Sequence, residues 1–194
     1  MCNDILSDSD IEKIYQNFDL ELDSDCTNNN EKSVICDIKK DNKLINETKI
    51  GRTYYREYDL IKYIFKGKVA KHDMFILKAE YRNKGIAKSI HNNEMDIYQK
   101  NNFKQIQLEA AFDGIIVWKK LGFNYVNKNA ERNLITAWKK YAKDILKLST
   151  KEIIKINKIS DISKSRLKPN NKIQFTKWYQ KLEKSELFKM YKDI

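Results

Sequence analysis

The chain has 194 residues, of which 41% are hydrophobic, and its formal net charge is +11. This length and apolar content exclude a wholly disordered chain and favour one domain with extensions. No apolar run reaches the roughly 20 residues that cross a bilayer, and the acidic start Met1–Asp4 is unlike a secretion signal. We therefore expect a cytoplasmic protein without a membrane partner.

The charge is divided unevenly along the chain. Residues 1–31 hold nine acidic residues and one lysine, so the rest of the chain carries a net charge of +19. A basic body attracts nucleic acid, an acidic membrane surface or coenzyme phosphates. Because lysine is abundant throughout, a solvated lysine-rich surface explains the charge equally simply, and nucleic acid is a less favoured partner.

The three cysteines, Cys2, Cys26 and Cys36, show no C-x-x-C spacing. An odd number of cysteines without a secretion signal predicts reduced thiols and no zinc site. Only two histidines are present, so we expect no metal cofactor.

In chain order, the sequence first predicts a short helix over 11–18 and a polar loop over 23–31. Antiparallel strands follow, which the residue pattern places at 34–38, 44–50 and 53–65. The run Met74–Leu77 contains four large apolar residues, which is typical of a strand buried on both faces, and we place this central strand at 73–79.

The second half of the chain alternates helices and strands. Helices are expected at 86–100, from Asp113 to Gly122, at 134–148 and at 173–192, and strands at 105–110 and 123–126. This order after an antiparallel meander predicts an α/β protein with a mixed sheet.

A basic, glycine-containing turn joins the central strand to the helix at 86–100, within the segment Glu80–Ala87. The first backbone N–H groups of a helix have no intrahelical partner and lie at the positive end of its dipole. Because Gly85 lets the backbone approach a ligand closely, this junction is a candidate phosphate site. A simple turn is the alternative.

A second motif, Trp118–Phe123, closes a later helix before another short strand. Together the two motifs resemble those of the GNAT acyltransferase superfamily, which read approximately Pro-Glu-Tyr-Arg-Gly-Lys-Gly-Ile-Gly and Tyr-Glu-Lys-Leu-Gly-Phe. The resemblance covers residues 51–126. It implies a mixed, mostly antiparallel central sheet flanked by helices. We place this core at 32–127, between the acidic segment 1–31 and a basic helical C-terminal extension over 128–194, which lies outside the resemblance and is expected to pack on the core.

The resemblance also implies a function and a set of binding residues. The expected reaction is direct transfer of an acyl group, most simply acetyl from acetyl-CoA, to an amine of a protein or small molecule. The residues expected to bind the coenzyme are Ile76, Leu77, Arg82, Asn83, Lys84, Gly85, Ile86, Ala87, Lys88 and Trp118.

Two residues are candidates for the general base that an amine with a pKa near 10 requires. Glu109 lies off the apolar face of its strand, and His72 has a suitable ordinary pKa. A surface carboxylate and a strand-end imidazole are the structural alternatives.

The chain departs from the family at Trp118, where family members commonly have a tyrosine that protonates the leaving thiolate. Trp118 cannot take this role, because an indole N–H is not a usable acid. Tyr81 and Tyr125 are open substitutes. A less-studied GNAT branch with tryptophan at this position is also similar, and there Arg52, Arg56 or His72 would meet substrate.

Two further functions stay open. One is a non-catalytic module of GNAT type that binds acyl-CoA or a partner, and the other is an RNA-directed protein that acetylates aminoacyl-tRNA. The sequence does not specify the acceptor or the oligomeric state.

Overall fold

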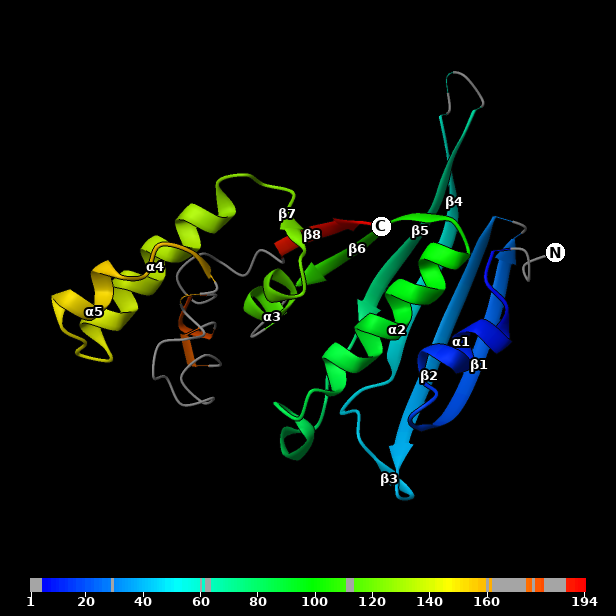
Figure 1. Cartoon of the computed structure of the whole chain (residues 1–194), viewed down its shortest axis with the longest axis horizontal. Coiled ribbons are helices and arrows are strands. Elements are labelled where there is room, and N and C mark those ends of the chain that lie inside the picture. Colours follow the sequence, from blue (N-terminus) through cyan, green and yellow to red (C-terminus); the bar gives the residue numbers. More distant parts are fainter. Residues whose placement is uncertain are drawn as a thin grey trace. The chain divides into compact units, whose positions relative to one another are not determined.

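The computed structural model describes residues 5–28, 30–59, 61, 64–110, 114–159, 161, 174–175, 177–179 and 188–194 (Figure 1). The chain divides into two compact units, Met1–Leu108 with Lys192–Ile194, and Glu109–Tyr191. The predicted mixed α/β class, with a mostly antiparallel sheet and flanking helices, is confirmed.

The first unit is a sheet covered by helices. Its elements are α1 (Asp8–Ile14), β1 (Asp19–Asn28), β2 (Glu31–Lys40), β3 (Lys43–Leu44), β4 (Ile50–Asp59), β5 (Ile64–Met74), the 3-10 turn η2 (Ala79–Tyr81), α2 (Ile86–Lys100) and β6 (Phe103–Ala110), which ends beyond the unit's boundary. Strands β1, β2, β4 and β5 are antiparallel neighbours, and β3 pairs with β2. Strand β6 is parallel to β5, which requires a crossover, and α2 supplies it.

Helix α2 forms where it was predicted because its apolar residues recur at helical spacing. Ile90, Ile97 and Tyr98 are buried on its inner face. Helices α1 and α2 lie side by side over one face of the sheet (Figure 1), where the Asn93 side-chain amide donates to the Ile14 carbonyl at 2.9 Å. The helix that supplies the candidate phosphate site is thus anchored in the core.

The N-terminal part of the chain is more ordered than the sequence suggested. The prediction of a loop over the polar stretch 23–31 is wrong, because this stretch forms the end of β1 and the start of β2, which pair with each other. The buried Lys32 ammonium donates to the Leu6 carbonyl at 2.9 Å and to Asp8 at 2.6 Å. Residues that the sequence set apart as an acidic segment therefore belong to the first unit.

The strand boundaries in this unit also differ from those predicted. The expected strand over 44–50 is mostly irregular, and the single strand over 53–65 is two strands, β4 and β5, that form a long hairpin. The central strand expected at 73–79 ends at Met74. No glycine, proline or asparagine lies between Asp59 and Ile64, so the sequence carries no strong turn signal at this reversal.

The cysteines are not all reduced. Cys26 is disulfide-bonded, so the prediction of free thiols is wrong at that position. Cys36 is free and buried, and burial raises the pKa of its thiol to about 11. Cys2 lies outside the described residues.

The second unit consists mainly of helices around an aromatic core. Its elements are α3 (Gly114–Lys120), β7 (Asn124–Tyr125), α4 (Ala130–Asp144), α5 (Thr150–Ile154) and most of β8 (Phe188–Asp193), which pairs antiparallel with β7. The helix predicted at 134–148 forms as α4 but begins and ends four residues earlier, with Trp138 and Tyr141 buried against Phe175.

The prediction of a helix over 173–192 is wrong at its C-terminal end, because Phe188–Asp193 forms strand β8, which pairs with β7. Its middle, residues 180–187, and the expected helix cap Asp113 lie outside the described residues. In the described part of the chain, no helix is long and apolar enough to cross a membrane.

Candidate functional site

The chain between β5 and α2 is held against the segment that precedes β4. The Glu47 N–H donates to the Ile76 carbonyl at 2.8 Å, and the Lys78 N–H donates to the Ile45 carbonyl at 3.0 Å. Leu77 therefore faces Asn46 in an isolated antiparallel bridge. This change of pairing partner explains why β5 ends at Met74 although the apolar run continues.

Two residues with positive φ shape the loop that follows. Asn83 has φ 61° and Gly85 has φ 79°. Asparagine is among the few residues that tolerate this left-handed conformation, which explains how Asn83 can occupy a position that favours glycine. A Cβ at Gly85 would meet nothing within 4 Å, so the glycine is required for its conformation rather than for space.

The N-terminus of α2 is left open for an anion. Gly85 is its N-cap, without a side-chain hydrogen bond, and its first turn contains no acidic residue. By contrast, α1 is capped by Ser7 and carries Asp8 and Asp10 in its first turn. The unpaired N–H groups and the dipole of a 15-residue helix thus lack the usual internal partner.

The side chains around this N-terminus are mostly basic or small. Lys84 and Lys88 are exposed, and the Lys84 ammonium lies 5.5 Å from the centre of the Tyr81 ring. Ile86 and Ala87 are half-buried, whereas Gly85 is exposed, so the helix end is accessible. Two exposed lysines, one just before the helix start and one in its first turn, suit a phosphate.

Arg82 is used to hold the loop. Its Nε donates to the Leu77 carbonyl at 2.7 Å, and its Nη2 lies 2.8 Å from Glu47 Oε2. The Leu77 carbonyl and the Arg82 guanidinium are therefore engaged within the chain, as is the Ile76 carbonyl. The sequence placed all three residues at the coenzyme, and the structure shows them fixing the shape of the loop.

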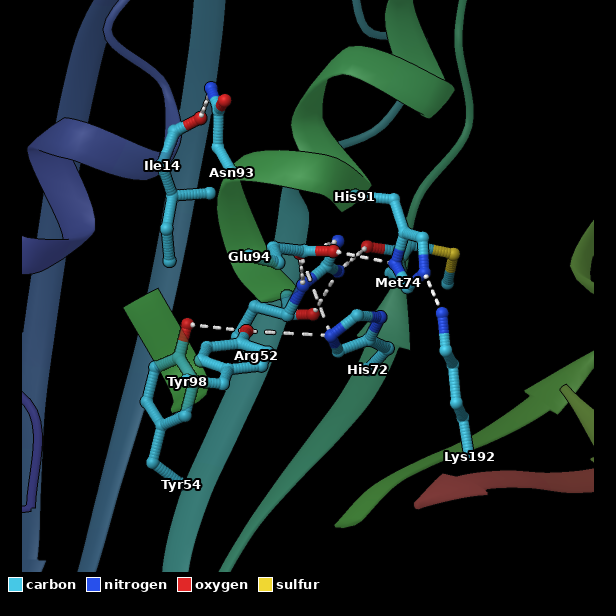
Figure 2. Close-up of polar contacts among 11 residues, drawn as sticks. Ile14, Arg52, Tyr54, His72, Met74, His91, Asn93, Glu94, Tyr98 and Lys192 are labelled. Carbon is cyan, nitrogen blue, oxygen red and sulfur yellow. Dashed lines mark hydrogen bonds and ion pairs between the residues drawn. The ribbon is translucent and has the colours of Figure 1, made fainter. Parts of the chain in front are cut away.

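His72 lies in the core and not at the loop. It is 4% exposed, and its Nε2 lies 3.4 Å from the Tyr98 hydroxyl and 3.5 Å from Glu94 Oε1 (Figure 2). Burial, with the charge of Arg52, lowers its pKa to about 3, against the attraction of Glu94. This position does not suit the general-base role expected from the sequence, because a base must reach the amine.

Arg52 and Glu94 form a buried ion pair next to His72 (Figure 2). Both side chains are 1% exposed, and Arg52 Nε donates to Glu94 Oε1 at 3.0 Å. Burial raises the Glu94 pKa, but His72, Arg52 and His91 outweigh this effect and lower it to about 2. The substrate contact that the tryptophan branch implied for Arg52 is wrong, because the guanidinium is enclosed in the core.

Glu94 was not predicted as a site residue, although the sequence carries a signal for it. Glu94 lies four residues after Ile90 and three before Ile97, so the helical spacing places it on the buried stripe of α2. A charged residue on an apolar stripe requires a buried partner, and Arg52 supplies it.

The two remaining predicted site residues belong to the second unit. Glu109 is exposed on β6. Trp118 lies on α3, half-buried, with its ring 5.3 Å from that of Phe123. A Cβ at Gly114 would lie 3.3 Å from Trp118 Nε1, so the glycine leaves room for the indole. The roles of Glu109 and Trp118 stay predictions.

The substitute proton donors differ in their surroundings. The Tyr125 hydroxyl is buried and donates to the Ile115 carbonyl at 2.8 Å. Burial raises the pKa of this hydroxyl above the ordinary value for tyrosine. Tyr81 is half-buried beside the loop. Across the described ranges, no group of three or more histidine, cysteine or acidic residues could hold a metal ion.

No protein-family model matches the sequence, and no curated protein matches it significantly. Several solved structures are similar. Naa50 from Arabidopsis thaliana, in complex with the bisubstrate analogue CoA-Ac-MVNAL, is 18% identical over 49% of this chain and 58% of its own, with a TM-score of 0.36. A GNAT family acetyltransferase from Elizabethkingia anophelis with acetyl-CoA bound is 10% identical over 58% of this chain and 79% of its own, with a TM-score of 0.37.

The ribosomal-protein-alanine N-acetyltransferase from Brucella melitensis biovar Abortus 2308 is 15% identical over 49% of this chain and 65% of its own, with a TM-score of 0.34. The chain thus spans less than two thirds of the length of the Arabidopsis and Brucella proteins. The likeness is partial, and the function proposed below rests on the loop itself.

Proposed function

We propose that this protein binds the pyrophosphate of an acyl-CoA at the N-terminus of α2 and transfers the acyl group, with acetyl as the expected group, to an amine. One observation carries the proposal: a 15-residue helix begins without a side-chain cap or an acidic first turn. The loop before it has two positive-φ residues, Asn83 and Gly85. This combination binds anions in proteins.

Each part of the loop has a distinct role in this proposal. The backbone N–H groups over 83–88 bind the pyrophosphate, and Lys84 and Lys88 add charge-assisted contacts. Arg82 holds the loop through Glu47 and the Leu77 carbonyl. Because the Ile76 and Leu77 carbonyls accept from Glu47 and Arg82, the proposal assigns these two residues to the shape of the loop and not to the pantetheine.

The reaction follows from the chemistry of the two substrates. The nitrogen lone pair of the neutral amine attacks the thioester carbonyl, so a C–N bond forms and the C–S bond breaks. The amine loses a proton to a general base, for which exposed Glu109 is the sequence-based candidate. The leaving thiolate has an ordinary pKa near 8.5 and takes a proton from water.

A second candidate function is acyl-CoA binding without catalysis. It is favoured by Trp118 at the position where GNAT enzymes commonly have a proton-donating tyrosine, and by Tyr125, whose hydroxyl is engaged by the Ile115 carbonyl. The two functions share the loop and differ only in turnover.

Thermal unfolding with added ligand tests the binding step. A ligand at 100 times its Kd stabilises the native state by about 2.7 kcal/mol, which raises the Tm of a chain of this length by roughly 5–10 °C. Acetyl-CoA should give this increase, and acetylated pantetheine, which lacks the pyrophosphate, should not. Equal effects of the two ligands would contradict the site.

Release of free thiol from acetyl-CoA distinguishes the two functions. An enzyme should release thiol in proportion to added amine, measured over a panel of peptide N-termini, lysine derivatives and polyamines. A protein that binds acetyl-CoA and releases no thiol with any amine would be a binding module.

A further inference from the structure

Arg52 connects three parts of the first unit through a single buried guanidinium. From β4 it reaches Glu94 on α2, with both Nε and Nη2 3.0 Å from Glu94 Oε1. Its Nη1 donates to the Gly51 carbonyl at 2.9 Å and to the carbonyl of Met74, the last residue of β5, at 3.1 Å. Figure 2 shows the guanidinium between the helix and the strand end.

Strand β5 and helix α2, which Arg52 joins in this way, flank the candidate loop on either side. Residues 75–85 leave β5 directly after Met74 and enter α2 at Gly85. Phe75 is the first residue of this segment, and the centre of its ring lies 5.7 Å from the Arg52 guanidinium. The loop is therefore closed at its base by Arg52 and in its middle by Arg82.

We propose that Arg52 and Glu94 are positioning residues that fix the N-terminus of α2 relative to the end of β5, so that the loop N–H groups converge on the coenzyme pyrophosphate. This inference rests on the proposed function. Ile90, Ile97 and Tyr98 pack α2 on the sheet through apolar contacts, which tolerate small shifts. An arginine–carboxylate pair has a fixed geometry, so it does not tolerate such shifts of the helix.

The energetics agree with a positioning role. A buried ion pair is weak support for stability, because desolvation of the two charges offsets most of their attraction. Apolar residues at both positions would serve the core as well. A phosphate site, in contrast, loses affinity when its donors move by about an ångström.

The rest of the cluster supports Glu94 in one orientation. Glu94 Oε2 lies 3.6 Å from His91 Nδ1, and the other ring nitrogen of His91 lies 2.9 Å from the ammonium of Lys192. Glu94 Oε1 is therefore held by Arg52, while Oε2 faces the His91 ring.

The test replaces the pair by apolar residues in the full chain. The double variant Arg52→Met/Glu94→Leu keeps a filled core and removes the fixed geometry. Tyr54→Phe is the matched control, because it removes a buried hydroxyl that contacts Tyr98 in the same cluster and has no link to the loop. Coenzyme A affinity is measured by calorimetry, and Tm by circular dichroism.

We expect the double variant to keep a Tm within a few degrees of wild type and to bind coenzyme A at least tenfold more weakly, while Tyr54→Phe binds normally. Wild-type affinity in a folded double variant would overturn the inference. If the double variant does not fold, Arg52→Lys keeps the charge and loses the multiple hydrogen bonds. It should show the same tenfold loss relative to Tyr54→Phe, and no difference from Tyr54→Phe would overturn the inference.

Hydrogen exchange separates this inference from the proposed function. If wild-type protein does not bind coenzyme A, the proposed function fails. The positioning role of Arg52 and Glu94 is then tested in the ligand-free protein by amide exchange over 83–88. Faster exchange in Arg52→Lys than in Tyr54→Phe supports the positioning role, and equal exchange overturns it.

Discussion

Replacing His72 by glutamine should reduce the loss of stability that acid causes in this protein. His72 is buried, and its pKa falls from 6.5 to about 3 on folding. The unfolded chain therefore binds the proton more readily, so the free energy of unfolding is unaffected above pH 6.5 and falls between pH 6.5 and 3. At 1.36 kcal/mol per pH unit, acidification from pH 6.5 to 4.5 costs about 3 kcal/mol.

Glu94 contributes little in this window. Its pKa on folding is lowered from 4.5 to about 2, so its contribution is present above pH 4.5 and is lost as the pH falls from there towards 2. The effect between pH 6.5 and 4.5 is thus assigned to His72.

Urea unfolding at pH 7.0 and 4.5 at constant ionic strength measures the effect. Circular dichroism should be used and not tryptophan fluorescence, because Trp118 and Trp138 lie in the second unit, whereas His72 lies in the first. His72→Gln should lose about 3 kcal/mol less than wild type between the two pH values. Tyr98→Phe, which removes a neighbour of His72 without changing its charge, should follow wild type. Parallel pH dependence of wild type and His72→Gln would refute the reasoning.

Three further predictions concern the loop, the disulfide and the proton donor. Gly85→Asp should change stability little, because a carboxylate at a helix N-terminus is favourable by about 0.3–1 kcal/mol and offsets the strain of about 1 kcal/mol that the positive φ imposes, and it should bind acetyl-CoA at least tenfold more weakly. Gly85→Ala should cost about 1 kcal/mol for its positive φ and bind normally, and equal loss of binding in both variants would contradict the anion site. Thiol titration of the denatured chain should find one thiol before reduction and three after, and three before reduction would exclude the disulfide at Cys26. Tyr125→Phe should cost about 1 kcal/mol, for the lost bond to the Ile115 carbonyl, and leave the rate of thiol release unchanged, whereas a slower rate would identify Tyr125 as the proton donor.

The features predicted correctly from sequence depend on local patterns. Helix α2 was predicted from its stripe of Ile90 and Ile97, and β6 from the alternation of Ile106 and Leu108, which are buried as expected. The position of the loop follows from Gly85, whose conformation is a property of its own backbone.

The features that were missed depend on partners far apart in the sequence. The end of β5 is set by residues 45–47, which displace β4 as the partner of the chain after Met74. Strand β8 forms because β7 pairs with it, against a helical pattern of its own. The Arg52–Glu94 pair joins residues 42 positions apart, so only the unexpected charge on the apolar stripe of α2 pointed to it.

Backbone amide NMR of the full chain tests the central claim most directly. Titration with coenzyme A, and separately with inorganic pyrophosphate, should shift the amide signals of residues 83–88 more than any others, because those N–H groups would donate to the pyrophosphate. Coenzyme A binding with its largest shifts elsewhere, or no binding at millimolar concentration, would contradict the claim.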